Sequence, residues 1–324
     1  MTSSHPTKAV SLRLSVTDRC QLACRYCRPA SGCNASGNVP DPLCFEDIAY
    51  FVKLIQRHFC LSKVHLTGGE PLLKPRLTKL VRLLTDEGLD LALTTNGQCL
   101  KKHASALQQA GLGRVNVSLD SLHPQTFSNM TRGGNVEHTL NGIKRAKEVK
   151  LHPIKINVTV LRGLNDHEIE AIAQYGLSIG CEVRFLELMP IGPAKGDFDT
   201  YFVSASEIHK RLTQAFTLKP INATPGQSAQ RFLAQTAQGQ EGLLGLIAPY
   251  TRPFCAGCRR LRLTSTGQLI TCLASGHSID MSRWIRQRDS HSDRVILEIV
   301  NRELDAKCMR GPFHTSRTMV AVGG

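Results

Sequence analysis

The chain has 324 residues, and its 40 Lys and Arg against 26 Asp and Glu give a formal net charge of +14. This length allows about two domains of ordinary size, and the positive charge indicates an anionic partner such as a phosphorylated small molecule, a nucleic acid or an acidic protein. The first residues, MTSSHPTKAVSLRL, lack the apolar segment of a signal peptide, and no run of about 18 apolar residues follows. We therefore expect a soluble, cytoplasmic protein that has no membrane partner.

Short β-rich runs alternate with helical patterns from residue 9 to about residue 190. Strands are predicted at SLRLSVT, KVHLTGG, LALTTNG, RVNVSLD, IKINVTV and EVRFLEL, with helices between them such as FEDIAYFVKLIQRHF and PRLTKLVRLLTDEG. Strands that alternate with helices predict parallel βαβ units.

Each of the first five predicted strands has one apolar and one polar face. In IKINVTV, for example, Ile156 and Val158 share one face while Lys155, Asn157 and Thr159 share the other. A closed eight-stranded barrel fills its interior with bulky branched side chains, so polar inner faces favour a wider barrel that holds a polar ligand. We expect an α/β fold, an incomplete (βα)6 TIM-like barrel over residues 1–200. A sheet with one solvated face remains the alternative.

The pattern changes after about residue 195, and we expect a smaller C-terminal domain over residues 201–324. In it, residues 222–242, NATPGQSAQRFLAQTAQGQEG, are predicted to form a loop. The segment PFCAGCRRLRLTSTGQLITCL predicts a cysteine-containing turn followed by a hairpin that reverses at Thr266 and Gly267.

Six of the twelve cysteines form two groups of three. They are Cys20, Cys24 and Cys27 in the first group, and Cys255, Cys258 and Cys272 in the second. A structural zinc site closes with four ligands, whereas three thiolates can hold three irons of a [4Fe–4S] cluster and leave the fourth iron open to an outside ligand. The remaining cysteines are expected to be small buried or loop thiols without a site role. These are Cys33, Cys44, Cys60, Cys99, Cys181 and Cys308.

The C-x3-C-x2-C run, followed by TGGEP at residues 67–71 and NVSLD at residues 116–120, resembles the radical S-adenosylmethionine (SAM) superfamily. The resemblance implies that SAM binds the open iron and is cleaved to a 5′-deoxyadenosyl radical. It also implies cofactor-binding roles for four residues. These are Tyr26, Gly69, Ser118 and Met189.

The second cysteine group, together with TGGEPLL, TTNG, CAGCRRLRL and the terminal Gly-Gly, resembles the GTP 3′,8-cyclase family of molybdenum cofactor biosynthesis. The resemblance implies a C-terminal domain with a second [4Fe–4S] cluster whose open iron binds guanine. It also implies that the radical abstracts the ribose 3′ hydrogen and that GTP becomes 3′,8-cyclo-7,8-dihydro-GTP. The implied substrate contacts are Arg13, His65, Thr94, Lys155, Arg260, Leu261 and Arg262, and the implied catalytic residues are Arg260, Arg262, Gly323 and Gly324.

Some of these residues indicate anion binding without the resemblance. Arg260 and Arg262 lie two apart on one strand face, and Arg13 and Lys155 belong to polar strand faces; guanidinium forks suit phosphate. His65 stands where the family usually has Arg or Lys. An ordinary histidine pKa near 6.5 predicts that it is a weaker, pH-sensitive phosphate contact.

The sequence is also compatible with two other functions. One is a radical SAM enzyme that modifies a peptide and carries an auxiliary cluster. The other is a zinc protein that binds nucleic acid, its second site completed by His277 or Cys308; the charge favours it, but an aromatic content of 5% disfavours base stacking. The family resemblance implies GTP, an electron donor protein, a cyclic pyranopterin monophosphate synthase downstream and a homodimer as partners, and no nucleic acid.

Overall fold

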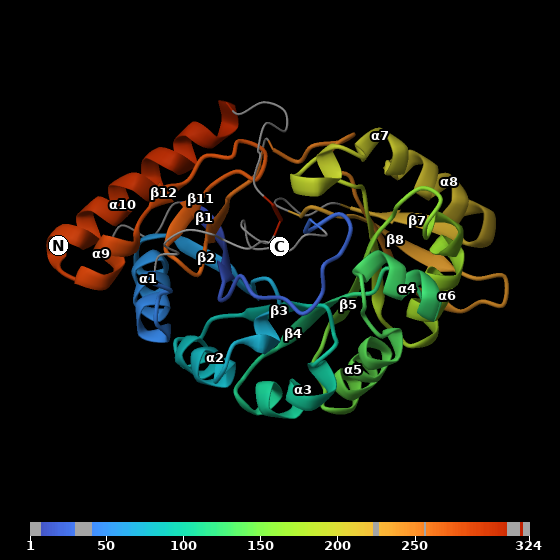
Figure 1. Cartoon of the computed structure of the whole chain (residues 1–324), viewed down its shortest axis with the longest axis horizontal. Helices are drawn as coiled ribbons and strands as arrows, with labels where there is room; N and C mark the ends of the chain where they lie inside the picture. The colour runs from blue at the N-terminus through green and yellow to red at the C-terminus, as the bar shows by residue number, and fades with distance from the viewer. Residues whose placement is uncertain (1–7, 30–40, 223–226, 256, 310–317, 320–324) are drawn as a thin grey trace.

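The fold is known from a computed structural model, which describes residues 8–29, 41–222, 227–255, 257–309 and 318–319. Six parallel strands follow one another in sequence order and in space. They are β1 (Ala9–Ser15), β2 (Cys60–Thr67), β3 (Leu91–Thr95), β4 (Arg114–Ser118), β5 (Ile154–Thr159) and β6 (Glu182–Leu186). Figure 1 shows that they form a curved sheet with helices along its convex side.

The helices between these strands are α1 (Phe45–His58), α2 (Leu77–Thr85), α3 (Leu100–Gln109), α4 (Pro124–Thr131), α5 (Val136–Glu148) and α6 (Ile169–Ser178). Local capping explains where some of them begin. The carboxylate of Asp47 accepts a hydrogen bond from the backbone of Cys44 at the start of α1, and Asn135 accepts one from the Glu137 amide at the start of α5. Both helices predicted by name, α1 and α2, are confirmed.

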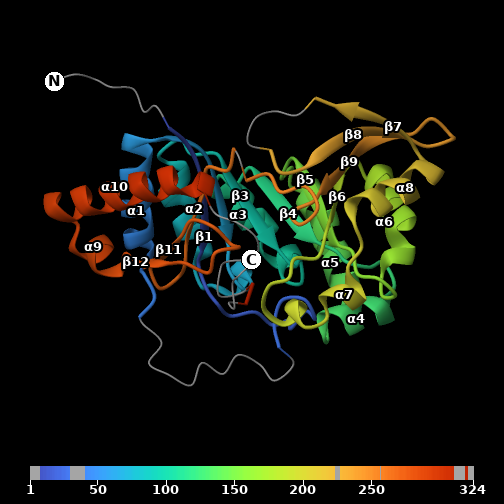
Figure 2. The ribbon, with the colours of Figure 1, turned by 90° about the horizontal axis from the view of Figure 1, so that it is seen from above.

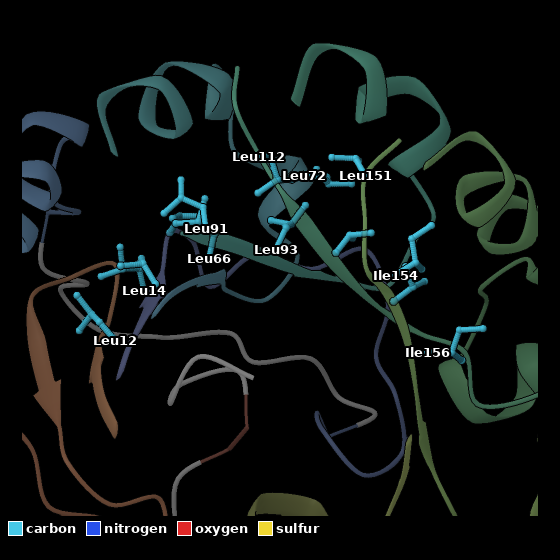
Figure 3. Packing of buried hydrophobic residues seen from close by; sticks show 14 of the residues in the cluster. Leu12, Leu14, Leu66, Leu72, Leu91, Leu93, Leu112, Leu151, Ile154 and Ile156 are labelled. Atoms are coloured by element: carbon cyan, nitrogen blue, oxygen red, sulfur yellow. The ribbon is translucent and has the colours of Figure 1, made fainter. Parts of the chain in front are cut away.

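The apolar strand faces pack against the helices, as the alternation predicted. The strand register aligns Leu14 with Leu66 and Leu66 with Leu93, and all three side chains are buried. Figure 3 shows these leucines, together with Ile156, on the side of the sheet that faces the helices. Burial of each such side chain contributes about 2 kcal/mol. The opposite, polar face therefore lines the concave side of the sheet.

Strands from the C-terminal part of the chain extend this sheet at both edges. Beyond β6 lie β9 (Glu241–Ile247), β8 (Gln230–Gln235) and β7 (Thr217–Ile221); beyond β1 lie β10 (Arg260–Leu263), β11 (Gln268–Ile270) and β12 (Ile279–Asp280). β9 pairs parallel with β6, and β10 pairs parallel with β1. The twelve described strands run from β12 to β7 as an open series, and Figure 2 shows the two added groups at opposite ends of the molecule. The incomplete barrel is confirmed.

Four further described helices follow β6 in the chain. They are α7 (Phe198–Tyr201), α8 (Ala205–Ala215), α9 (Ser282–Gln287) and α10 (Ser290–Asp305), with the 3-10 turns η1 (Pro71–Leu73), η2 (Asp166–Glu168), η3 (Gly192–Lys195) and η4 (Ala306–Met309). Among the helices that the structure describes, none combines the length and the apolar composition needed to cross a membrane. The division of the chain at residue 200 stays a prediction, although β9 and β10 share one sheet with β1 to β6.

The loop predicted over residues 222–242 is wrong where β8 forms. Phe232 and Ala234 are buried on one face of this strand, and it pairs antiparallel with β9 through a turn in which Gly239 has φ +82°. The many Gln and Ala residues of this segment made its short alternation of buried and exposed side chains hard to recognise as a strand, and pairing with β9 stabilises it. The hairpin at Thr266 and Gly267 is confirmed, since β10 and β11 pair antiparallel and Gly267 has φ +87°.

Candidate active site

The first cysteine group lies in the loop that leaves the carboxyl end of β1. The loop runs beside the end of α4, where the amides of Ala23 and Arg25 donate to the carbonyl oxygens of Thr131 and Met130 at 3.1 and 3.0 Å. Burial raises the pKa of the Cys24 thiol well above its usual value, with further increases from Asp120 and the neighbouring Cys27 and Cys20. The three thiols are thus close enough to interact. None is in a disulfide.

The glycine turn after β2 packs directly on this cysteine loop. The amide of Gly69 donates to the Thr17 carbonyl at 2.7 Å, and the Glu70 amide donates to the Arg19 carbonyl at the same distance. A Cβ on Gly69 would lie 2.4 Å from the Arg19 oxygen. The glycine is therefore required for close approach of two backbone segments, which places the turn beside the cysteines.

Glu70 ties the ends of β2 and β3 together beneath the loop. Its buried carboxylate accepts hydrogen bonds from the Thr95 hydroxyl at 2.7 Å, the Asn96 amide at 2.8 Å and the Leu72 amide at 3.0 Å. Burial raises the pKa of Glu70 to about 7. The Asn96 side chain lies 3.7 Å from the sulfur of Cys20, so this network also supports the first cysteine group.

The predicted SAM contacts all lie at the carboxyl ends of strands. Tyr26 is in the cysteine loop, where its hydroxyl donates to Asp120 at 2.7 Å; Ser118 ends β4, and Met189 follows β6. Burial raises the pKa of Asp120 to about 6. Active-site loops of parallel α/β folds occupy this edge, and here it joins the Gly69 turn to the cysteine loop.

The second cysteine group lies at the opposite end of the strand pair formed by β1 and β10. Cys255 and Cys258 precede β10 and Cys272 follows β11. Although burial raises the pKa of Cys258, Lys307 and Arg260 lower it more, so the net shift is downward. The ammonium of Lys307 also donates to the Arg260 carbonyl. Because β10 runs parallel to β1, Cys258 is at the amino end of this strand pair and Cys20 is beyond its carboxyl end.

The concave face between the two groups carries arginine. Arg262 on β10 pairs in register with Arg13 on β1, and Arg13 pairs with His65 on β2, so the three side chains share one face. Burial lowers the pKa of Arg13 to about 10, helped by Arg260, and it lowers that of Arg262 well below the usual value. Arg260 adds a fourth basic group, and its Cζ lies 4.7 Å from the centroid of the Phe254 ring. Leu261 between the two arginines is buried on the opposite face.

His65 departs from the expectation of a half-charged group. Burial lowers its pKa to about 3, with contributions from Arg13 and Arg114, so the ring is neutral at physiological pH. This low pKa does not agree with the predicted sensitivity near pH 6.5, because the pKa of a solvated histidine reflects neither the burial nor the adjacent guanidinium groups. The contact between His65 and a phosphate stays a prediction.

A second row of polar side chains crosses β3 to β6. The register aligns Thr94 with Asn116, Asn116 with Lys155, and Lys155 with Glu182. The Lys155 ammonium is 3.4 Å from the Glu182 carboxylate. Burial lowers the pKa of Lys155 to about 8; Arg184 also lowers it, and Glu182 raises it.

The sequence analysis missed three charged residues in or beside this row. Glu182 and Arg184 alternate on the polar face of EVRFLEL, a signal that was available, whereas Arg231 lay in the segment expected to be a loop. Gly323, Gly324 and Cys33 lie outside the described residues. His65, Thr94, Lys155, Arg13, Arg260 and Arg262 are brought to one face.

The two cysteine groups suit iron–sulfur clusters better than single metal ions. In the described part of the chain, no three His, Cys, Asp or Glu side chains are gathered so that they could hold one ion. In a [4Fe–4S] cluster each thiolate binds a different iron, and three interacting, undisulfided thiols supply that kind of donor set. The residues present therefore fit one cluster at each end of the polar face.

Comparison with known proteins supports this interpretation. Residues 14–176 match the radical SAM superfamily and residues 181–311 match the family described as Molybdenum Cofactor Synthesis C. GTP 3′,8-cyclase of Hydrogenovibrio crunogenus is 36% identical over 319 residues, 97% of this chain and 96% of that protein. The same enzyme of Thermodesulfovibrio yellowstonii is 37% identical over 318 residues, 97% of each chain.

The chain belongs to the GTP 3′,8-cyclase family of radical SAM enzymes.

Solved structures agree with the fold of this cyclase. Streptococcus suis SuiB bound to S-adenosylmethionine superposes with a TM-score of 0.61 over 90% of this chain and 68% of its own, at 14% identity. SuiB has also been solved with its precursor peptide. Because the identity is low, this likeness supports the radical SAM fold alone, while the cyclase relatives favour GTP chemistry over peptide modification.

Proposed function

We propose that this member of the cyclase family converts GTP to 3′,8-cyclo-7,8-dihydro-GTP, with Cys20, Cys24 and Cys27 holding the cluster that binds SAM. Cys255, Cys258 and Cys272 would hold the second cluster. When bound, the first cluster and SAM supply a 5′-deoxyadenosyl radical that removes the ribose 3′ hydrogen. The observation that carries the proposal is the single polar face, lined by Arg13 and Arg262, that connects the two cysteine groups.

The spacing along the strands suits one nucleotide. Arg260 pairs in register with Ser11. Six residues separate Ser11 from Thr17 at the cysteine loop, which corresponds to roughly 20 Å of strand. A nucleoside triphosphate can extend across such a face. Its guanine would lie toward Cys258 and its ribose toward Cys20, with the phosphates against the basic side chains.

The side chains on this face bind and orient the substrate. The guanidinium forks of Arg13 and Arg262 present paired donors to phosphate oxygens, and Lys155 adds a cation from β5. Neutral His65 offers a ring N–H or a ring nitrogen and no charge. The backbone of Gly69 and the Tyr26 and Ser118 positions would hold SAM at the carboxyl edge, close to the ribose.

The direct test is an anaerobic assay of the full chain. We expect about eight irons and matching sulfide per chain. With SAM and a strong reductant, GTP should increase 5′-deoxyadenosine and yield a product of GTP mass whose C8 is bonded to C3′. Zinc without iron, or stimulation by a peptide and not by GTP, would refute the proposal.

We also propose that the protein works in the cytoplasm with an electron donor protein and as a homodimer. Its product would pass to a cyclic pyranopterin monophosphate synthase. These partners follow from the family and from the reaction, which needs a one-electron reductant and releases an unstable nucleotide. Light scattering of the cluster-loaded protein tests the dimer.

A further inference from the structure

A buried carboxylate sits among three cations on the concave face of β5, β6 and β8. The Glu182 side chain is 5% exposed. One of its oxygens lies 2.7 Å from Nε of Arg184 and 3.4 Å from Nε of Arg231; the other lies 3.4 Å from Nζ of Lys155 and accepts from Arg231 at 3.4 Å. Burial alone would raise the pKa of Glu182, yet the three cations hold it below its usual value.

The charges of this cluster do not balance. One carboxylate and three cations leave a net charge of +2, and buried charge is costly unless it is compensated. Lys155 is the member that the register places beside Asn116 and Thr94, toward the middle of the polar face. Arg184 on β6 and Arg231 on β8 both pair in register with Gly245 on β9, which lies between them. A Cβ on Gly245 would lie 3.2 Å from Cγ of Arg184, so the glycine leaves room for the arginine side chain.

We propose that Glu182 is a positioning residue for substrate: its carboxylate fixes the Lys155 ammonium group on the polar face and offsets the repulsion from Arg184 and Arg231, so that Lys155 can bind a phosphate of GTP. The inference rests on the proposed function for the identity of the anion. Glu182 itself does not touch the substrate, because a carboxylate repels phosphate.

Glu182 also sets the pH range over which Lys155 stays charged. Burial and Arg184 already lower the pKa of Lys155 to about 8, and Glu182 is the group that opposes them. The charged groups that face Lys155 are Glu182 and Arg184 on β6 and Arg231 on β8, while its β4 neighbour Asn116 is neutral. Without the carboxylate, the Lys155 pKa falls further and the ammonium loses its proton within the neutral range.

The first test is steady-state kinetics of the cluster-loaded Glu182→Gln enzyme between pH 6.5 and 8.5. At pH 7.5 we expect the KM for GTP to rise about threefold, because lowering the Lys155 pKa of about 8 by about one unit reduces its protonated fraction about threefold, with a much smaller change in kcat. The rise of KM with pH should begin at lower pH than in the unmodified enzyme. Glu182→Asp, which retains the charge, should restore part of the affinity.

A matched control is Glu207→Gln. Glu207 lies on α8, away from the polar face, and pairs with Arg211 on the same helix and with Arg162. It should leave the KM for GTP and its pH dependence unchanged. If Glu182 acted only by repelling GTP directly, removing its negative charge would tighten GTP binding and lower the KM. A lower KM in Glu182→Gln overturns the proposal.

The second test does not require turnover. Competitive acetylation of Lys155 as a function of pH, read by mass spectrometry without GTP, reports the protonation of this lysine. Half-labelling should move to lower pH in Glu182→Gln and stay in place in Glu207→Gln. An unchanged Lys155 profile overturns the positioning role, whereas a shifted profile in a protein that fails to convert GTP refutes the proposed substrate and leaves the role of Glu182 toward Lys155 standing.

Discussion

Arg13 and Arg262 are paired in register across the parallel strands β1 and β10, so two buried guanidinium groups lie side by side on the concave face. Arg260 adds positive charge near both and lowers the pKa of each. Paired guanidinium groups of this kind suit a phosphate-bearing ligand. The pair links β1, which leads to the first cysteine group, with β10, which follows the second.

Arg262→Lys should lower kcat/KM for GTP by about tenfold or more. Lysine keeps the charge but loses the planar fork that binds two oxygens. Arg162→Lys provides the control, because Arg162 makes a two-pronged pair with Glu207 at the surface. Steady-state kinetics with GTP checks both; equal kcat/KM in Arg262→Lys and the unmodified enzyme would contradict a forked phosphate contact.

His65→Gln should remove a pH dependence of stability. The folded pKa of His65 is about 3, against 6.5 for a solvated histidine, so the unfolded state binds a proton below pH 6.5 and the folded state does not. Stability is then lost as pH falls, by about 1 kcal/mol between pH 7 and 5.5. Chemical denaturation at both pH values should show this loss in the unmodified protein and a smaller one in His65→Gln. Identical losses would mean that His65 is protonated in the fold.

Cys258→Ser should separate the two clusters. We expect the iron content to fall from about eight to about four per chain, with SAM binding retained and conversion of GTP abolished. Cys24→Ser should instead abolish SAM cleavage. Cys60→Ser, at an exposed thiol on β2, is the control and should change neither. Loss of SAM binding in Cys258→Ser would show that the two groups are not independent sites.

Gly69→Ala should disturb the first cluster without unfolding the protein. The added Cβ would come within 2.4 Å of the Arg19 carbonyl, so the cysteine loop must move. We expect less iron at this site and weaker SAM binding, measured by metal analysis and calorimetry. Gly113→Ala adds the same atom where it meets only ordinary contact, 3.8 Å from the Leu91 carbonyl, and should retain both. Full iron and SAM affinity in Gly69→Ala would mean that the loop adapts.

Much of the barrel was predictable because strand alternation is a local property. Lys155 and Asn157 face the concave side simply because Ile156 and Val158 must face the helices. The spacing of Cys20, Cys24 and Cys27 likewise indicates a three-thiolate site without reference to the rest of the chain. By contrast, β8 was missed because its short alternation becomes a strand only when it pairs with β9.

Residue identity and a two-residue period are enough to predict the donor chemistry and which strand faces are polar. The placement of Cys258 and Cys20 at opposite ends of one face depends on long-range folding, because β10 joins β1 from the far end of the chain. The burial that keeps His65 neutral and the contacts of Glu182 with Lys155 and Arg231 depend on it as well. Charge and pKa in such a site follow from neighbours that are distant in the chain, and no local pattern contains them.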